Sequence, residues 1–126
     1  MRQSELNQVI QSALEQVGIA TDVDTVRFPN IVALFEDAFE RHSARKACTS
    51  LGHDLTYGDL DVLTRHFAAW LQQESGLKPG DRVAVQMPNL IQYLVVVLGI
   101  LRAGMVVVNT NPLYTEREVE HQFNDA

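Results

Sequence analysis

The stretch from Gly80 to Phe123 constrains the fold of this chain most, because it has the pattern of strand, buried helix, strand and helix. Residues 82–86 form a predicted strand, residues 90–103 a helix that is apolar nearly all round, and residues 105–108 a second strand without polar alternation. A strand–helix–strand unit implies parallel strands joined by a crossover. We therefore expect an α/β fold, with a mostly parallel sheet layered between helices on both faces.

A second pair of strands is predicted upstream. The segments KACTS (46–50) and HDLTY (53–57) flank Leu51-Gly52, which is typical of a hairpin with a tight turn. This hairpin is expected to make the sheet mixed. Parallel sheets need further strands beside them, and the sequence ends three residues after Phe123. We therefore expect an incomplete N-terminal piece of a larger domain.

The first 24 residues are predicted to differ from the rest. Apolar side chains recur at helical spacing over residues 3–17, and Gly18 is expected to end that helix. Residues 19–29 lack a helical period and include Pro29, which predicts an extended arm whose apolar side chains touch the body only in places. The expected organisation is an amphipathic helix and arm over residues 1–24, followed by a domain portion over residues 25–126. The apolar side chains of the arm are Val23, Val26 and Phe28.

Capping residues mark where the other helices begin. Asn30 precedes an apolar stripe and is expected to cap a helix that ends near His42-Ser43. Thr56 and Asp59 resemble a capping box for a helix that runs to about Glu74. A second capping box opens the last helix, which has an apolar side; its residues are Thr115 and Glu118.

Composition limits the class of protein and of partner. Apolar residues make up 46% of the 126 and charged residues 21%, as in ordinary soluble globular proteins. A net charge of −6 provides no basic field for a phosphate backbone, which argues against nucleic-acid partners. Cys48 is the single cysteine, so an internal disulfide is impossible, and a reducing compartment such as a cytoplasm fits the sequence.

The apolar run from Leu90 to Val108 resembles a membrane span at first sight. Gln92, Arg102 and the break at Ala103-Gly104 divide it into a helix and a strand, and each is too short to cross a bilayer. The N-terminus is amphipathic and rich in Gln and Glu, without the continuous apolar core of a secretory leader.

The sequence offers few groups for chemistry. Its glycines match neither a phosphate loop nor the dinucleotide pattern, and Asp22 and Asp24 lack the further oxygen ligands of a calcium loop. Cys48 has no general base nearby in sequence, so it is interpreted as a packing residue. The turn after the strand, VAVQMPN (83–89), lies where α/β proteins place ligands, although a Pro-Asn helix start is the simpler interpretation. The histidines show no metal-ligand spacing; they are His42, His53, His66 and His121.

Three segments are similar to the N-terminal region of the adenylate-forming superfamily of acyl-CoA ligases. They are LTYGDLDVLTRHFAAWLQ (55–72), GLKPGDRVAVQMPNLIQYLVVVLGILRAGMVVVNTNPLYT (76–115) and EREVEHQF (116–123). The segment NTNPLYTEREVEHQFND (109–125) most resembles the bacterial long-chain fatty acid-CoA ligases, and the similarity extends over residues 25–126. The chain departs mildly from the superfamily pattern, with Glu116 where proline is common and with Val119 and Phe123 where leucine is usual.

The resemblance implies a parent enzyme that activates a fatty acid with Mg-ATP to an acyl-adenylate, releases pyrophosphate, and transfers the acyl group to CoA. Such an enzyme needs a phosphate loop, an acidic magnesium ligand, a ribose-binding Asp and a late Lys, and residues 1–126 supply none of them. ATP, Mg and CoA would therefore serve the parent, and we assign no catalytic, cofactor-binding or metal residue here. The segment alone is expected to be inactive. Its partner would be the remainder of its own chain; homodimer formation and peripheral membrane association of the parent stay open.

The sequence also fits a function of a different class. The chain could be a stand-alone protein-interaction or dimerisation module, using the amphipathic helix at residues 3–17 or an open sheet edge. Unpaired edge strands and half-covered apolar helices are prone to association.

Overall fold

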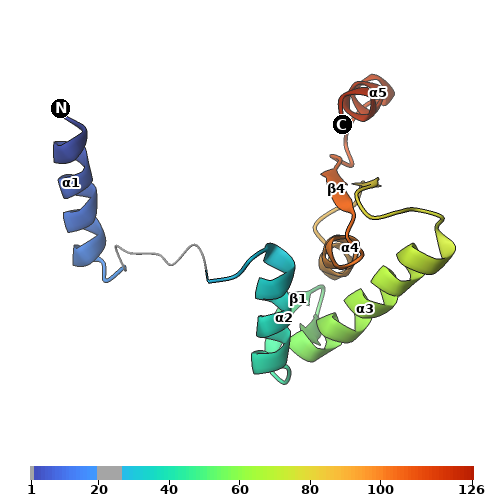
Figure 1. Ribbon diagram of the computed structural model, residues 1–126, viewed down its shortest axis with the longest axis horizontal. Coiled ribbons are helices and arrows are strands. Elements are labelled where there is room, and N and C mark those ends of the chain that lie inside the picture. Colours follow the sequence, from blue (N-terminus) through green and yellow to red (C-terminus); the bar gives the residue numbers. More distant parts are fainter. Residues whose placement is uncertain (1, 20–26) are drawn as a thin grey trace.

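The computed structural model describes residues 2–19 and 27–126, and its elements follow the predicted order (Figure 1). Most of the predicted arm, including Asp22, Val23, Asp24 and Val26, and the expected division after residue 24 lie outside the described residues. The elements are α1 (Gln3–Gln16), α2 (Ile31–His42), β1 (Lys46–Ser50), β2 (His53–Thr56), α3 (Tyr57–Glu74), β3 (Arg82–Val85), α4 (Ile91–Arg102), β4 (Val106–Asn109) and α5 (Glu116–Asp125).

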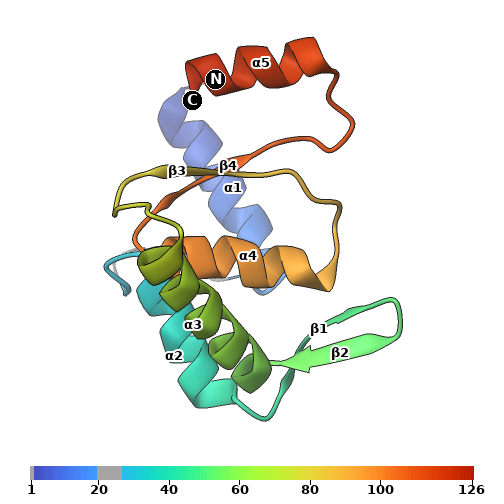
Figure 2. The same ribbon diagram turned by 90° about the vertical axis from the view of Figure 1, so that its right-hand side faces the viewer.

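The strands pair as predicted, but they form two separate sheets within the described residues. β1 and β2 are antiparallel, with Ser50 opposite His53, and β3 and β4 are parallel, with Val83 opposite Val107. The α/β class is confirmed, whereas the hairpin does not join the parallel strands in one mixed sheet. Figures 1 and 2 show α4 between the two pairs. Because α4 is apolar nearly all round, it needs cover on several sides, and the hairpin provides part of that cover.

Helices cover both faces of the parallel pair, as expected. In Figure 2, α4 lies on one side of β3 and β4, and α5 lies on the other. Val83 and Val85 of β3 face the core that α4 shares, and Ala84 faces α5, where it lines a small hollow with Phe123. Successive side chains along β3 therefore point alternately toward α4 and toward α5.

The core is built around α4. Ile100 is fully buried and packs with Leu71 of α3 and Val85 of β3. A second cluster joins Leu98 of α4 to Phe39 of α2 and Leu60 of α3. One helix therefore contributes to both clusters, which agrees with its being apolar nearly all round. In the described part of the chain, no helix is both long and apolar enough to cross a bilayer.

The predicted caps are confirmed. The side-chain oxygen of Asn30 accepts a hydrogen bond from the Ala33 amide at 2.9 Å. Thr56 and Asp59 form a reciprocal capping box at α3, and Thr115 and Glu118 form another at α5. Hydrogen bonds from the capping threonines lower the pKa of both acidic side chains.

The N-terminal helix, α1, buries none of its residues.

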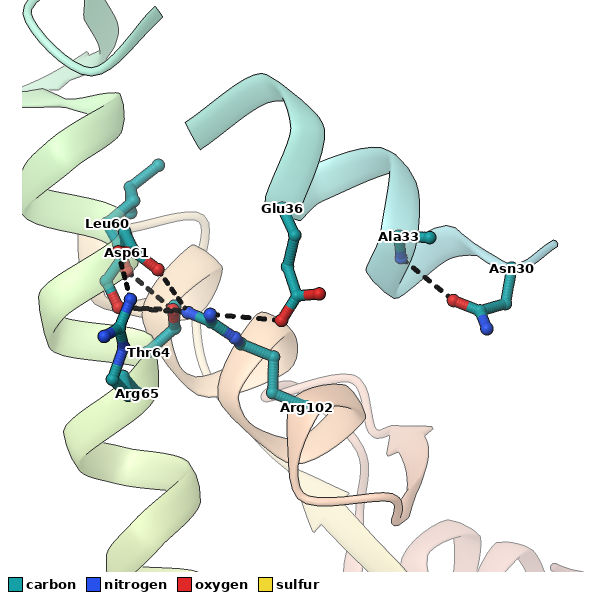
Figure 3. Close-up of polar contacts among 8 residues, drawn as sticks. All are labelled: Asn30, Ala33, Glu36, Leu60, Asp61, Thr64, Arg65 and Arg102. Atoms are coloured by element: carbon teal, nitrogen blue, oxygen red, sulfur yellow. Dashed lines mark hydrogen bonds and ion pairs between the residues drawn. The ribbon is translucent and has the colours of Figure 1, made fainter. Parts of the chain in front are cut away.

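Arg102, at the end of α4, joins three helices (Figure 3). Its Nη1 donates to Asp61 Oδ1 at 2.8 Å and to Thr64 Oγ1 at 2.9 Å, both on α3. Its Nη2 donates to Glu36 Oε1 of α2 at 3.2 Å, and its guanidinium lies 5.5 Å from the centre of the Phe39 ring. The Arg102 side chain is only 11% exposed, so these contacts satisfy a charge that is largely removed from water.

Asp61 receives a second cation from its own helix. Arg65 Nη2 lies 2.5 Å from Asp61 Oδ2, but the Arg65 side chain is 66% exposed. Burial raises the pKa of Asp61, and the hydrogen bonds from Arg65 and Arg102 outweigh that effect, so its pKa lies below the ordinary value. Asp61 is therefore held as a carboxylate.

Replacing Gly99 by alanine should destabilise the protein. A Cβ at this position would lie 2.7 Å from Phe67 Cδ1 and 3.2 Å from the Thr64 carbonyl oxygen, so the Phe67 ring or α3 itself would have to shift away from α4. We expect a net loss of about 1–2 kcal/mol in the free energy of unfolding, because overpacking outweighs the higher helix propensity of alanine. Urea denaturation measures this, and Phe67→Leu combined with Gly99→Ala should recover part of the loss. An unchanged midpoint for Gly99→Ala would contradict the close packing.

Removing the Arg102 guanidinium should cost more than removing that of Arg65, although both contact Asp61. Arg102→Met leaves Asp61 and Glu36 without their shared cation, and we expect a loss of about 2 kcal/mol after allowing for the partial exposure of both carboxylates. Arg65→Met is the matched control and should cost less than about 1 kcal/mol. The measurement is the urea midpoint of each variant. Equal losses would show that burial does not set the difference.

Lowering the pH should reduce the difference in free energy of unfolding between the wild type and Asp61→Asn. The folded pKa of Asp61 lies below its ordinary 3.8, so the stabilisation is fully present above that value and is lost as pH falls through the folded pKa. The difference in free energy of unfolding between wild type and variant should be constant from about pH 5 to 8 and shrink below about pH 4. Denaturation curves at stepped pH test this. A difference that does not shrink as pH falls below that ordinary value would rule out ionisation of Asp61 as its origin.

Candidate functional site

The carboxyl ends of β3 and β4 form the position in this fold where a ligand is most expected. The chain leaves β3 toward α4 on one face of the sheet, and it leaves β4 toward α5 on the opposite face (Figure 2). Adjacent parallel strands whose connections diverge in this way create a topological switch point, and α/β proteins bind ligands in the crevice outside it. The sequence predicted a ligand position at residues 83–89, after β3. In the structure, the loop of residues 110–115, after β4, forms the other side of this position.

Polar contacts fix the loop that follows β4. Tyr93 Oη donates a hydrogen bond to Asn109 Oδ1 at 2.8 Å, which ties β4 to the first turn of α4. Gln86 Nε2 donates to the Asn111 carbonyl at 3.3 Å, and Gln122 Nε2 of α5 donates to the Asn109 carbonyl at 2.8 Å. The Oε1 atom of Gln122 is buried and has no partner among the described residues. The side-chain amides of Gln86 and Gln122 and the phenol of Tyr93 therefore hold the segments that follow β3 and β4 together.

A hollow of about 300 Å³ opens beside this edge, between β1 and the start of α4. Tyr93 belongs both to the hollow and to the hydrogen bond with Asn109, so the two features are contiguous. The walls combine apolar side chains with hydroxyl, thiol and amide groups, and none of the lining residues is acidic, basic or a histidine. They are Cys48, Thr49, Ser50, Asn89, Leu90, Ile91, Tyr93 and Leu94.

A second hollow, of about 460 Å³, lies beside Arg102. Its charged groups include Glu36, Asp61 and Arg65, and these already pair with one another or with Arg102. Because their hydrogen bonds serve to join α2, α3 and α4, we interpret this region as structural.

Cys48 and the histidines were the remaining sequence features with chemical potential. Cys48 is partly buried and lines the hollow beside α4. The His42 ring packs against Tyr57, with their centroids 5.9 Å apart, where α2 meets the start of α3. Within residues 2–19 and 27–126, acidic, histidine and cysteine side chains do not gather in a group of three that could hold a metal ion.

Sequence reasoning did not identify Tyr93, Gln122 or the pairing role of Arg102. Tyr93 lies in an apolar helix, and Gln122 in a polar one, so neither stands out by composition. Arg102 offered a signal, since a charged residue at the end of an apolar buried helix requires a partner.

Comparison with known proteins agrees with the fold and identifies its family. The profile of the family described as AMP-binding enzyme matches residues 35–126. The chain is 51% identical over 108 residues to a "Long-chain-fatty-acid--CoA ligase" of Salmonella typhimurium and 50% identical over 108 residues to one of Escherichia coli O6:H1. Each match covers 86% of this chain and 19% of the relative, so the chain spans about a fifth of their length.

A solved structure shows the same architecture. The N-terminal subdomain of NpsA from Klebsiella oxytoca superposes with a TM-score of 0.73 at 25% identity, over 76% of this chain and 25% of that one. The profile match and the identity to the ligases thus agree with an independent likeness in three dimensions. The chain belongs to the AMP-binding enzyme family.

Proposed function

We propose that this chain is the N-terminal part of a long-chain fatty acid-CoA ligase. The full enzyme would activate a fatty acid with ATP to an acyl-adenylate and then transfer the acyl group to CoA. The observation that carries this proposal is the identity of about one residue in two to relatives of that name. That identity favours the ligase over a stand-alone interaction module.

The residues that line the hollow beside α4 do not fit the phosphates of ATP or a magnesium ion. The hollow beside α4 presents hydroxyl, amide and apolar groups without an ionised side chain, whereas stabilising charge on phosphate requires cations and holding Mg²⁺ requires carboxylates. We therefore place the catalytic, ATP-binding and magnesium-binding residues of the enzyme outside residues 1–126. The role of this segment is to frame the large domain.

Three finer features complete the proposal. The N-terminal helix and arm occupy residues 1–24, and the domain portion begins at residue 25. The enzyme works in the cytoplasm, which the single cysteine of this segment, Cys48, supports. It contacts membranes peripherally, because its substrates partition into lipid. It forms homodimers through α1, whose exposed Val9 and Ile10 support an association surface.

Fatty-acid-dependent exchange between ATP and pyrophosphate tests the assignment. The purified full-length protein should catalyse this exchange with long-chain fatty acids and Mg²⁺, and residues 1–126 alone should give no signal above the protein-free control. Acetate and an aryl acid are the matched substrate controls. Exchange with the aryl acid alone would contradict the substrate class, and exchange by residues 1–126 alone would contradict the placement of the catalytic groups.

A further inference from the structure

Asn109, the last residue of β4, is held by helices on both faces of the sheet. Tyr93 Oη of α4 donates a hydrogen bond to the Asn109 side chain at Oδ1, and the distance is 2.8 Å. Gln122 Nε2 of α5 donates to the Asn109 carbonyl, also at 2.8 Å. Because α4 and α5 lie on opposite faces of the parallel pair (Figure 2), the point at which the chain leaves the sheet is fixed from two sides.

The loop that begins there, residues 110–115, is held at further points. The Thr110 amide donates to the carbonyl of the last residue of β3 at 2.9 Å, and Gln86 Nε2 donates to the Asn111 carbonyl at 3.3 Å. Asn111 Oδ1 accepts a hydrogen bond from the Leu113 amide at 3.0 Å. Loops at protein surfaces are usually more mobile than the elements they connect. A loop with this many contacts favours a role that depends on its conformation.

The location of the loop indicates what that role is. Residues 110–115 form one side of the switch point at the carboxyl ends of β3 and β4, where α/β proteins bind ligands. The segments that meet there, residues 86–94 and 109–115, contain no acidic, basic or histidine residue. Recognition of phosphate or carboxylate groups relies on cationic partners. The part of a ligand that lies against this loop is therefore neutral.

We propose that Tyr93 and Gln122 are positioning residues of the ligase, which hold residues 110–115 in the conformation that binds the neutral, flexible part of a substrate. This inference rests on the proposed function, because that function supplies the substrates. The alkyl chain of a fatty acid and the uncharged arm of CoA are both neutral and flexible, whereas ATP has no such part. Neither side chain contacts the substrate itself, since both act through Asn109 and the loop.

Steady-state kinetics of acyl-CoA formation by the full-length enzyme test this role, with each of the three substrates varied in turn. Tyr93→Phe removes one hydroxyl and keeps the ring, and Gln122→Met removes the other donor to Asn109. Each variant should raise the KM for the same one substrate, the fatty acid or CoA. The expected rise is about two- to tenfold, the factor that corresponds to one lost hydrogen bond. The KM for ATP should stay within about twofold, because only the neutral substrate part loses its binding surface.

Gln72→Met is the matched control for Gln122→Met. Gln72 Nε2 donates to the Ala103 carbonyl at 3.4 Å, which places this glutamine–carbonyl bond near the amino end of β4. Its loss should leave all three KM values unchanged. Unchanged KM values in Tyr93→Phe and Gln122→Met would overturn the proposal. A rise shared by all three substrates, or the same selective rise in Gln72→Met, would overturn it too.

Hydrogen exchange measures the order of the loop without any catalysis. Amides within residues 110–115 should exchange faster in Tyr93→Phe than in the wild type, and they should be unaffected in Gln72→Met. Equal rates in Tyr93→Phe and the wild type would contradict the positioning role. A wild type that shows no fatty-acid-dependent activity would overturn the proposed function and the substrates named with it. An active wild type with unchanged KM values in the variants would overturn only the role of Tyr93 and Gln122.

Discussion

The burial of α4 on several sides is the constraint on which the rest of the structure depends. This helix separates the hairpin from the parallel strands, contributes Ile100 to one core cluster and Leu98 to the other, and approaches α3 at Gly99. An apolar helix of this kind is unstable at a surface, so the elements packed against it act as its cover. The parallel pair provides one side, α3 another, and α2 with the hairpin the remainder (Figure 2).

The charge at the end of α4 complements this apolar packing. Hydrophobic burial alone is non-directional and would allow α2 and α3 to slide along the helix. Arg102 requires defined partners because its charge is largely removed from water, and it finds them in Asp61 and Glu36 (Figure 3). The result is a fixed arrangement of three helices on one side of the sheet, which leaves the other side to α5.

The position of helices on both faces of the sheet determines how the loops at the carboxyl ends of β3 and β4 are arranged. With α4 on one side and α5 on the other, the loops after β3 and β4 diverge, and Tyr93, Gln86 and Gln122 hold the polypeptide in place there. The neighbouring hollow is apolar with polar groups at intervals, and it lacks charge.

Sequence patterns alone determined each element, since they depend on local physics. Periodicity predicted the helices and strands, and the caps at Asn30, Thr56 and Thr115 were correct because a capping hydrogen bond spans only three residues. Motif wording also identified the family, because several segments agreed in order and spacing.

Tertiary structure decided which elements meet. The hairpin was predicted correctly, but among the described residues it forms a sheet of its own and does not make the parallel sheet mixed, because α4 lies between the two pairs of strands. The partners of Arg102 lie 38 to 66 residues away along the chain, a separation that no local pattern encodes.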